Sequence, residues 1–166
     1  MNRYKYGGLE KRGLYLDETI MRMCQTHRRL FGQLVLHLLS EGKKDKALKA
    51  LQKVEQVIPT YNVPHSFISG SLDLARAYVL LGNRQKAASI IKDMWRNNVQ
   101  YVEWYLSLSG QNFAISQSEC LKHLMILNQI ASVAPMIGKN EAARQTKQLN
   151  ALYMQYQAKG GTFPEQ

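Results

Sequence analysis

The stretch from Arg28 to Pro59 constrains the fold more than any other part of the chain, because it carries two helical apolar stripes joined at a glycine. In its first half the apolar residues return every three or four positions, at Phe31, Leu34, Val35 and Leu38. In its second half Ala47 and Leu51 continue such a stripe, and Gly42 between the halves can end a helix. Two short amphipathic helices cannot bury their apolar faces alone, so this stretch predicts stacked neighbours.

The same spacing resembles a tetratricopeptide repeat (TPR). The first-helix residues fall at the bulky, Leu, small and bulky positions of that repeat, and Ala47, Leu51 and Pro59 follow at the second-helix spacing. A second unit repeats the pattern without the bulky opening residue, at Ser71, Leu74, Ala75, Tyr78, Gly82, Ala87 and Ile91. Gly42 and Gly82 are 40 residues apart, against about 34 in a TPR, so we place the extra residues in the turn from Tyr61 to His65.

A third, degenerate unit is indicated by Leu127, Ile130, Ala131, Ala134, Gly138 and Ala143. Lys147 in this unit occupies a position that favours a bulky apolar side chain. The sequence therefore predicts an all-α, TPR-like, right-handed solenoid of helical hairpins with about seven helices. An irregular arm covers residues 1–16, a helical domain residues 17–158 with units at about 28–61, 68–101 and 124–157, and a frayed tail residues 159–166.

Capping residues in the sequence predict where several helices begin. Asp17 is the predicted N-cap of a first helix from Glu18 to about Ser40, and Ser116 with Glu119 matches a capping box that starts a later helix. The aromatic segment from Trp95 to Gln111 breaks the repeat pattern, and we expect it to form an inserted helix. The arm contains Tyr4, Tyr6 and Tyr15, which we expect to pack it against the domain.

Composition limits the class of protein. The 166 residues, 45% of them apolar, suit one compact domain or a short solenoid, and the net charge of +10 favours anionic partners or surfaces. Cys24 and Cys120 have no Cys-x-x-Cys spacing, so we expect buried thiols. The start MNRYKYGGLEKRG has no apolar run of a signal peptide, no window is long and apolar enough to span a membrane, and a segment of a longer polypeptide would begin in this way.

No pattern of catalytic residues or of a cofactor site is found. A Ser elbow, a phosphate-binding Gly loop and paired carboxylates outside helix surfaces are all missing from the sequence. Cys24 and His27 have helical i, i+3 spacing, but a metal site needs three or four convergent ligands. We therefore expect no catalytic residue, no metal and no cofactor, and a buried thiol beside a surface or interface histidine.

TPR arrays receive extended peptides in a concave groove lined by their first helices. Transfer by register predicts a groove in this chain formed by Arg29, Leu36, Leu72, Arg76, Val79, Met125 and Asn128. Leu36 and Arg76 occupy positions where TPR clamps for acidic C-termini use Asn, so no dicarboxylate clamp is predicted. Arg29 and Arg76 could still pair with a peptide carboxylate.

The basic residues raise the question of an anion-binding surface. We expect Lys43, Lys46, Lys49 and Lys53, near one face of the second predicted helix, to form a solvated outer surface, with an anion-binding stripe as the alternative. Nucleic acid would use such charge with exposed aromatics such as Tyr101, Trp104 and Tyr105. Aromatic residues at this spacing more often pack in a core or between repeats, so a nucleic-acid partner is not favoured.

A closer resemblance covers nearly the whole chain, through the segments NRYKYGGLEKRGLYLDET, MRMCQTHRRLF, EGKKDKALKAL, IPTYNVPHSF, ARAYVLLG and VQYVEWYLSL. It is to the C-terminal soluble region of a bacterial family of multi-span membrane proteins, of uncharacterised function, that resemble protein O-mannosyltransferases. The resemblance implies a TPR-like tail behind a glycosyltransferase-like membrane domain, on the extracytoplasmic (periplasmic) side. The acidic catalytic loop of such a parent would lie in its membrane part.

These observations favour a non-catalytic domain that binds a protein or peptide and acts as a scaffold. The first alternative is a binder of anionic surfaces or nucleic acid, which salt-sensitive binding would reveal. The second is an enzyme or an accessory sugar-acceptor domain, for which a shift of the melting temperature with a glycan would be the sign.

Overall fold

The computed structural model describes residues 6–163, and all regular structure in this range is helical. The elements are α1 (Glu18–Ser40), α2 (Lys44–Val57), α3 (Ser71–Leu80), α4 (Arg84–Ser107), α5 (Gly110–Val133), the 3-10 helix η1 (Ala134–Met136) and α6 (Lys139–Ala158). The predicted all-α class is confirmed. The described residues hold six α-helices, however, and not about seven.

The difference in number arises in α4. The aromatic segment expected as an inserted helix continues directly from the preceding helix, so that α4 has 24 residues. Between Arg84 and Ser107 the sequence contains neither Gly nor Pro, and nothing therefore ends the helix near Trp95.

The capping box predicted at Ser116 is wrong. Helix α5 begins at Gly110 after the N-cap Ser109, and Ser116 lies inside it. Gly110 does not prevent initiation, because a helix tolerates Gly in its first turn, and Phe113 extends the buried face of α5 upstream of the expected start.

The first helical hairpin forms as its sequence predicts. The side chain of Asp17 accepts a hydrogen bond from the backbone N–H of Ile20 at 2.8 Å, which confirms the predicted N-cap of α1. At the other end Gly42 has a φ of 73°, and the Lys43 N–H donates to Leu38 O at 2.8 Å. The turn after α3 repeats this geometry with Gly82, at a φ of 83°, and Asn83 N–H donating to Tyr78 O at 2.8 Å.

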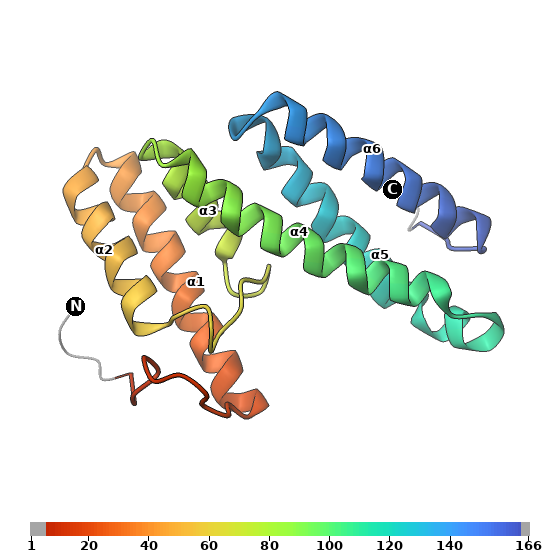
Figure 1. Cartoon of the computed structure of the whole chain (residues 1–166), viewed down its shortest axis with the longest axis horizontal. Helices are drawn as coiled ribbons and strands as arrows, with labels where there is room; N and C mark the ends of the chain where they lie inside the picture. The colour runs from red at the N-terminus through yellow and green to blue at the C-terminus, as the bar shows by residue number, and fades with distance from the viewer. Residues whose placement is uncertain (1–5, 164–166) are drawn as a thin grey trace. The chain divides into compact units, whose positions relative to one another are not determined.

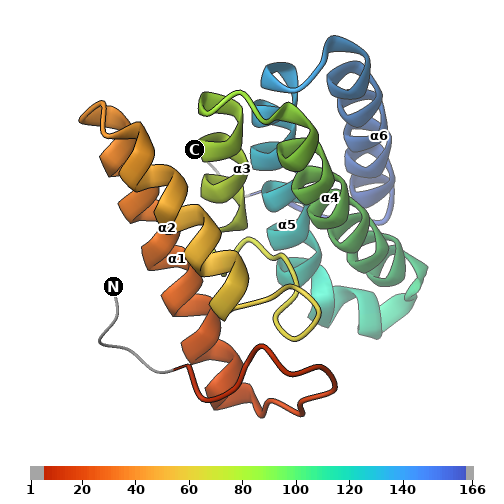
Figure 2. The same cartoon turned by 60° about the vertical axis from the view of Figure 1, so that its left-hand side comes forward.

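The chain divides within α4 into two compact units, up to Ile90 and from Ile91 onward. In the first unit α1 packs side by side with α2 and with α3 (Figures 1 and 2). Its core includes Val35, Ala47, Leu51, Val54 and Ala75. In the second unit α5 packs with α6 around a core that includes Leu124, Leu127, Ile130, Leu149 and Tyr156.

The C-terminal segment differs from the frayed tail expected from the sequence. The Gly161 N–H donates to Tyr156 O at 2.9 Å, and the Tyr156 hydroxyl donates to Thr162 O at 3.1 Å. The ring of Phe163 contacts those of Tyr153 and Tyr156. Residues 159–163 are thus held against α6, and the rest of the predicted tail lies outside the described residues.

Among the described residues, no helix has both the length and the apolar character needed to cross a bilayer.

Candidate functional site

Helices α1 and α3 approach each other closely at two glycines. A Cβ atom on Gly70, the N-cap of α3, would lie 2.7 Å from the Cα of Arg29, and one on Gly32 would lie 3.3 Å from the Cβ of Asp73. Moving three residues along α1 thus corresponds to moving three residues along α3, so the two helices run in the same direction. Helix α2 returns antiparallel to α1 after a turn of three residues.

The predicted groove residues of the first unit are only partly available on this surface. Arg29 is exposed on α1, and Leu36, Arg76 and Val79 are partly buried. Arg76 Nη1 lies 3.3 Å from Asp73 Oδ1, an ion pair one helical turn apart on α3. Leu72 is only 4% exposed, so its side chain belongs to the core and does not line an open groove. In the second unit Met125 and Asn128 are exposed on α5.

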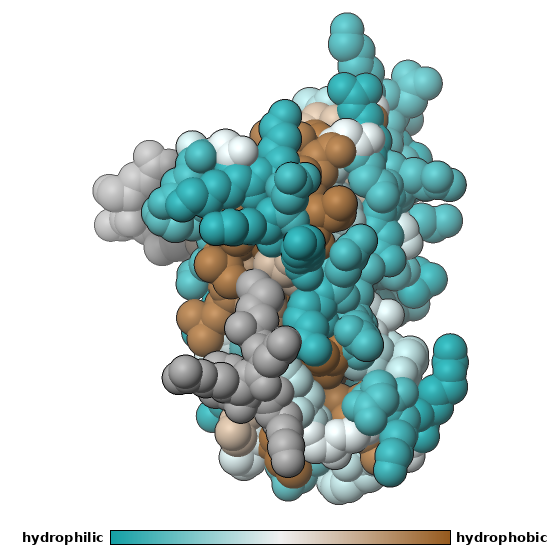
Figure 3. Space-filling view, turned by 90° about the vertical axis from the view of Figure 1, so that its left-hand side faces the viewer, coloured by the Kyte–Doolittle hydropathy of each residue, from teal (hydrophilic) through white to brown (hydrophobic). Residues whose placement is uncertain are grey.

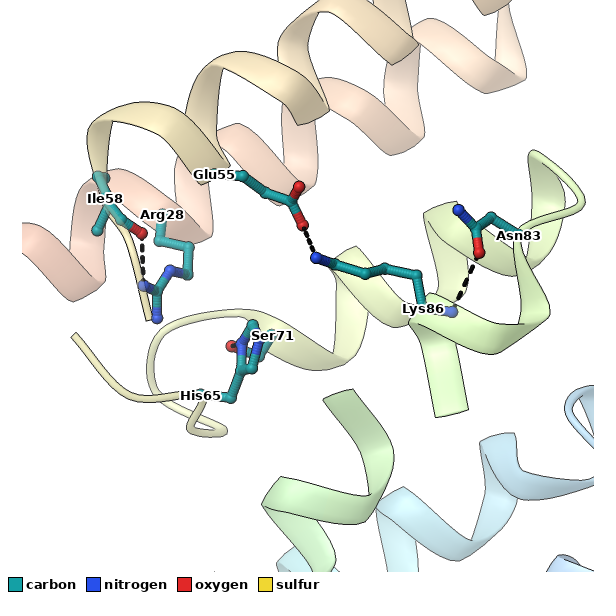
Figure 4. Close-up of polar contacts among 7 residues, drawn as sticks. All are labelled: Arg28, Glu55, Ile58, His65, Ser71, Asn83 and Lys86. Atoms are coloured by element: carbon teal, nitrogen blue, oxygen red, sulfur yellow. Dashed lines mark hydrogen bonds and ion pairs between the residues drawn. The ribbon is translucent and has the colours of Figure 1, made fainter. Parts of the chain in front are cut away.

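Arg28 is the most unusual side chain of the first unit, because it is only 1% exposed. Its guanidinium donates to Ile58 O at 2.8 Å (Figure 4), and also to Val63 O at 2.6 Å and Pro64 O at 3.0 Å. Burial lowers the pKa of Arg28 to about 10. Arg28 therefore holds the loop that leads from α2 to α3, which is the segment where the repeat spacing predicts extra residues.

The spacing of residues in α1 could have indicated that the side chain of Arg28 is buried. It lies four residues after the buried Cys24 and seven before the buried Val35, so it occupies the buried stripe of α1. A charged residue at such a position requires internal hydrogen-bond partners, and the inserted loop supplies them as carbonyl groups.

A cavity of about 200 Å³ lies beside Arg28. Glu55 and Lys86 line it, and Glu55 Oε1 lies 2.9 Å from Lys86 Nζ (Figure 4). Burial raises the pKa of Tyr78, which also lines the cavity, and a hydrogen bond to Glu55 raises it further. The backbone N–H of Lys86 donates to Asn83 Oδ1 at 3.1 Å. These contacts fix the first turn of α4 against α2 and α3.

His65 and Ser71 have the spacing of a catalytic pair, with Nδ1 and Oγ 2.9 Å apart (Figure 4). The Ser71 hydroxyl is also 2.9 Å from Ser69 Oγ, and both serines are fully buried. No substrate atom can reach Ser71 Oγ in this arrangement. The pair therefore belongs to a hydrogen-bond network that holds the N-terminus of α3.

Both cysteines are buried and unpaired, as the sequence predicts. Burial raises the pKa of Cys24, and it raises the pKa of Cys120 to about 11. The ring of His27, at the helical spacing considered for a metal pair, meets the ring of Tyr6 edge-on at 6.1 Å. Within residues 6–163, no three His, Cys, Asp or Glu side chains converge as metal ligands.

The arm is attached mainly through its backbone. Asn62 Nδ2 donates to Leu9 O at 2.7 Å and to Lys11 O at 2.6 Å, and the Tyr61 hydroxyl donates to Glu10 O. Leu9 is buried, whereas Tyr15 is 91% exposed. The expectation that the tyrosines pack the arm down is thus wrong for Tyr15, and Tyr4 lies outside the described residues.

The lysines of α2 are mostly exposed. Lys43, Lys46 and Lys49 are exposed and Lys53 is partly buried, which agrees with the predicted outer face. Lys43 Nζ also lies 2.6 Å from Glu41 Oε2, and this hydrogen bond lowers the pKa of Glu41.

In the second unit the aromatic residues of α4 divide between core and surface. Trp95 is buried and its Nε1 donates to Gln148 Oε1 at 2.9 Å. Tyr101 and Trp104 are more than half exposed, so our expectation of core packing is wrong for these two residues. The ring of Tyr101 stacks on His123 of α5 at 4.5 Å between ring centroids.

The tautomer of His123 follows from its neighbour. Asn98 Nδ2 donates to Met94 O, which leaves Asn98 Oδ1 as the acceptor 2.8 Å from His123 Nδ1. An amide oxygen only accepts, so Nδ1 carries the proton. Burial lowers the pKa of His123 below its ordinary value of 6.5, although Glu119 opposes this shift.

A pH dependence of stability follows from this shift. Because the pKa is lower in the folded protein, the unfolded chain binds the proton at a higher pH. The stability that His123 contributes is present above its unfolded pKa and declines as the pH falls toward its folded pKa. We expect urea unfolding at about pH 7.5 and 5.5 to show a larger loss of stability in the wild type than in His123→Gln. Equal losses in the two proteins would contradict this assignment.

The first unit thus combines the adjoining surfaces of two parallel helices with a small cavity beside Arg28, and the second carries exposed aromatic residues. Comparisons of the chain with protein-family models, with curated proteins and with solved structures find no match.

Proposed function

We propose that this chain is a TPR-like scaffold that binds a protein or peptide partner. The observation that carries the proposal is the order of packing in the first unit, where α1 is antiparallel to α2 and parallel to α3. A stack of helical hairpins requires this order, because each first helix must contact both its own second helix and the next first helix. The repeated glycine turns at Gly42 and Gly82 support the same repeat.

The partner binds the surface that α1 and α3 form together. Arg29 and Arg76 supply positive charge there, and Leu36 and Val79 supply partly exposed apolar atoms. The chemistry favours an extended peptide with a carboxylate between apolar side chains, since guanidinium groups bind carboxylates through two parallel hydrogen bonds.

Selection of peptides from a random displayed library tests this function. We expect enriched peptides to be acidic and apolar, and we expect Arg29→Ala with Arg76→Ala to weaken their binding by about tenfold or more, since hydrogen bonds between charged groups contribute ~1.5–3 kcal/mol each. Fluorescence anisotropy with labelled peptides measures the affinity.

Lys49→Ala on the exposed face of α2 is the matched control, because it removes one positive charge outside the groove. The proposal is refuted if no peptide is enriched, or if the arginine and lysine variants weaken binding equally.

The parent protein is a separate part of the proposal. The resemblance of the sequence supports a domain of a bacterial membrane protein that is similar to O-mannosyltransferases, placed on the extracytoplasmic side. Its test is whether the coding frame continues upstream into membrane-spanning segments. A stop codon and a promoter directly before Met1 would exclude it.

One observation supports a second candidate function, the binding of an anionic surface. Residues 1–90 contain 15 of the 22 Lys and Arg but seven of the 12 Asp and Glu. Sedimentation with anionic and neutral vesicles at low and high salt tests this candidate, because such binding weakens strongly with salt. Equal sedimentation with neutral vesicles would exclude it.

A further inference from the structure

Helix α1 carries a second apolar stripe that no described element covers completely. Ile20 is 44% exposed, Met23 58%, Leu30 54% and Leu34 39%. With the partly buried His27 between them, these positions are separated by three, four, three and four residues. An average of 3.5 residues is the spacing of the contact positions in a coiled coil. We refer to Ile20, Met23, His27, Leu30 and Leu34 as the α1 seam.

The α1 seam lies on the opposite side of α1 from α3. Gly32 faces α3, and Leu30 and Leu34 are each two residues from Gly32, which is a rotation of about 200° around the helix. The groove of the proposed function uses Arg29 and Leu36, on the side toward α3. A partner on the α1 seam would therefore occupy a different surface.

The N-terminal half of the seam opens onto a cavity of about 430 Å³ beneath the arm. Ile20, Met23 and His27 form one wall, and the arm residues Leu9, Leu14 and Leu16 are among those opposite. The hydrogen bonds of Asn62 to the arm backbone hold this opposite wall in place. The face of the molecule drawn in Figure 3 shows hydrophobic surface between hydrophilic side chains.

These features define the chemistry of the occupant. A spacing of 3.5 residues fits the side chains of another helix, and an extended strand would require alternation every two residues. The cavity accepts one bulky apolar side chain as an anchor, as in other grooves that bind helices. The excess of basic residues in the first unit favours an acidic helix and opposes a second copy of this chain, which would bring like charges together.

We propose that the α1 seam and the cavity beneath the arm form a docking site for an acidic amphipathic helix of a partner protein. The site is independent of the groove in which α1 faces α3. It also accounts for an apolar outer face on the first helix of a stack, where a terminal repeat ordinarily presents polar residues.

The test uses a synthetic helical peptide of about three heptads with Leu at the two contact positions and Glu at the flanking positions. A peptide of the same composition with the heptad order scrambled is the control. We expect the full chain to bind the patterned peptide in fluorescence anisotropy at least tenfold more tightly than the scrambled one, a difference of ~1.4 kcal/mol. Binding should weaken as salt is raised.

Leu30→Glu and Met23→Glu should each weaken binding by about tenfold or more, because each places a carboxylate in the seam opposite an acidic peptide. Ile115→Glu, an exposed apolar position of α5, is the matched control and should leave binding unchanged. Arg29→Ala should also leave it unchanged, which separates this site from the groove. Circular dichroism and urea unfolding confirm that each variant is folded.

Three results would overturn the proposal. The first is equal binding of the patterned and scrambled peptides, which would show charge attraction alone, or no binding of either. The second is equal binding by folded Leu30→Glu, Met23→Glu and wild-type proteins. The third is a dimer in sedimentation equilibrium that Leu30→Glu dissociates, which would assign the α1 seam to a second copy.

Discussion

Replacing Arg28 by methionine should lower the free energy of unfolding by about 2–4 kcal/mol, because it leaves buried carbonyl groups without donors. Methionine keeps much of the aliphatic volume but cannot donate to Ile58 O, Val63 O or Pro64 O. Urea unfolding measured by circular dichroism gives the difference.

Arg29→Met provides the matched control, since it makes the same substitution, with the same loss of charge, one position further along α1. Arg29 is exposed, so we expect its replacement to change the unfolding free energy by no more than about 0.5 kcal/mol. Similar losses for the two variants would contradict the role of Arg28 in holding the inserted loop. Hydrogen exchange should also rise in residues 58–64 of Arg28→Met, because these residues lose their anchor.

Replacing Gly70 by alanine should cost about 3 kcal/mol or more, for two reasons that act together. The residue has a φ of 68°, which costs an L-amino acid ~1–2 kcal/mol, and its new Cβ would lie 2.7 Å from the Cα of Arg29. That contact is with the backbone of α1, so a side-chain rotation cannot relieve it, and α1 must move away from α3. Thermal or urea unfolding measures the loss.

Gly42→Ala separates the two contributions. Gly42 has a similar φ of 73°, but an added Cβ there meets nothing within 4 Å. We therefore expect a cost of only ~1–2 kcal/mol, from the backbone conformation alone. Equal costs at Gly42 and Gly70 would show that α1 and α3 do not approach as closely as the structure indicates.

The helical class, the N-cap Asp17 and the first hairpin could be predicted because they depend on interactions between residues close in sequence. Prediction failed in the second half, where Trp95 and Ser116 were assigned as local boundaries inside helices that continue. At Trp95 the sequence contains no Gly or Pro that would end α4, and at Ser116 packing extended α5 upstream, where Phe113 is buried.

The residues of the candidate site also include some that could be predicted from the sequence and some that could not. Periodicity places Arg29 and Arg76 on the surfaces of α1 and α3, but register alone could not show that Leu72 is buried. The position of Arg28 in the buried stripe of α1 could have indicated its burial, but its three partners could not be predicted, because they are backbone carbonyls 30 to 36 residues away and leave no trace in side-chain patterns.

The amino-acid sequence by itself determined that this chain is helical and where its first hairpin turns, since periodicity, caps and glycines act locally, and it predicted a long loop between α2 and α3. Only the tertiary structure decided that Arg28 holds this loop, that Gly70 brings α3 against α1 and that the α1 seam stays open. Each of these features depends on which segments distant in sequence pack against one another, and helical periodicity contains no information about such packing.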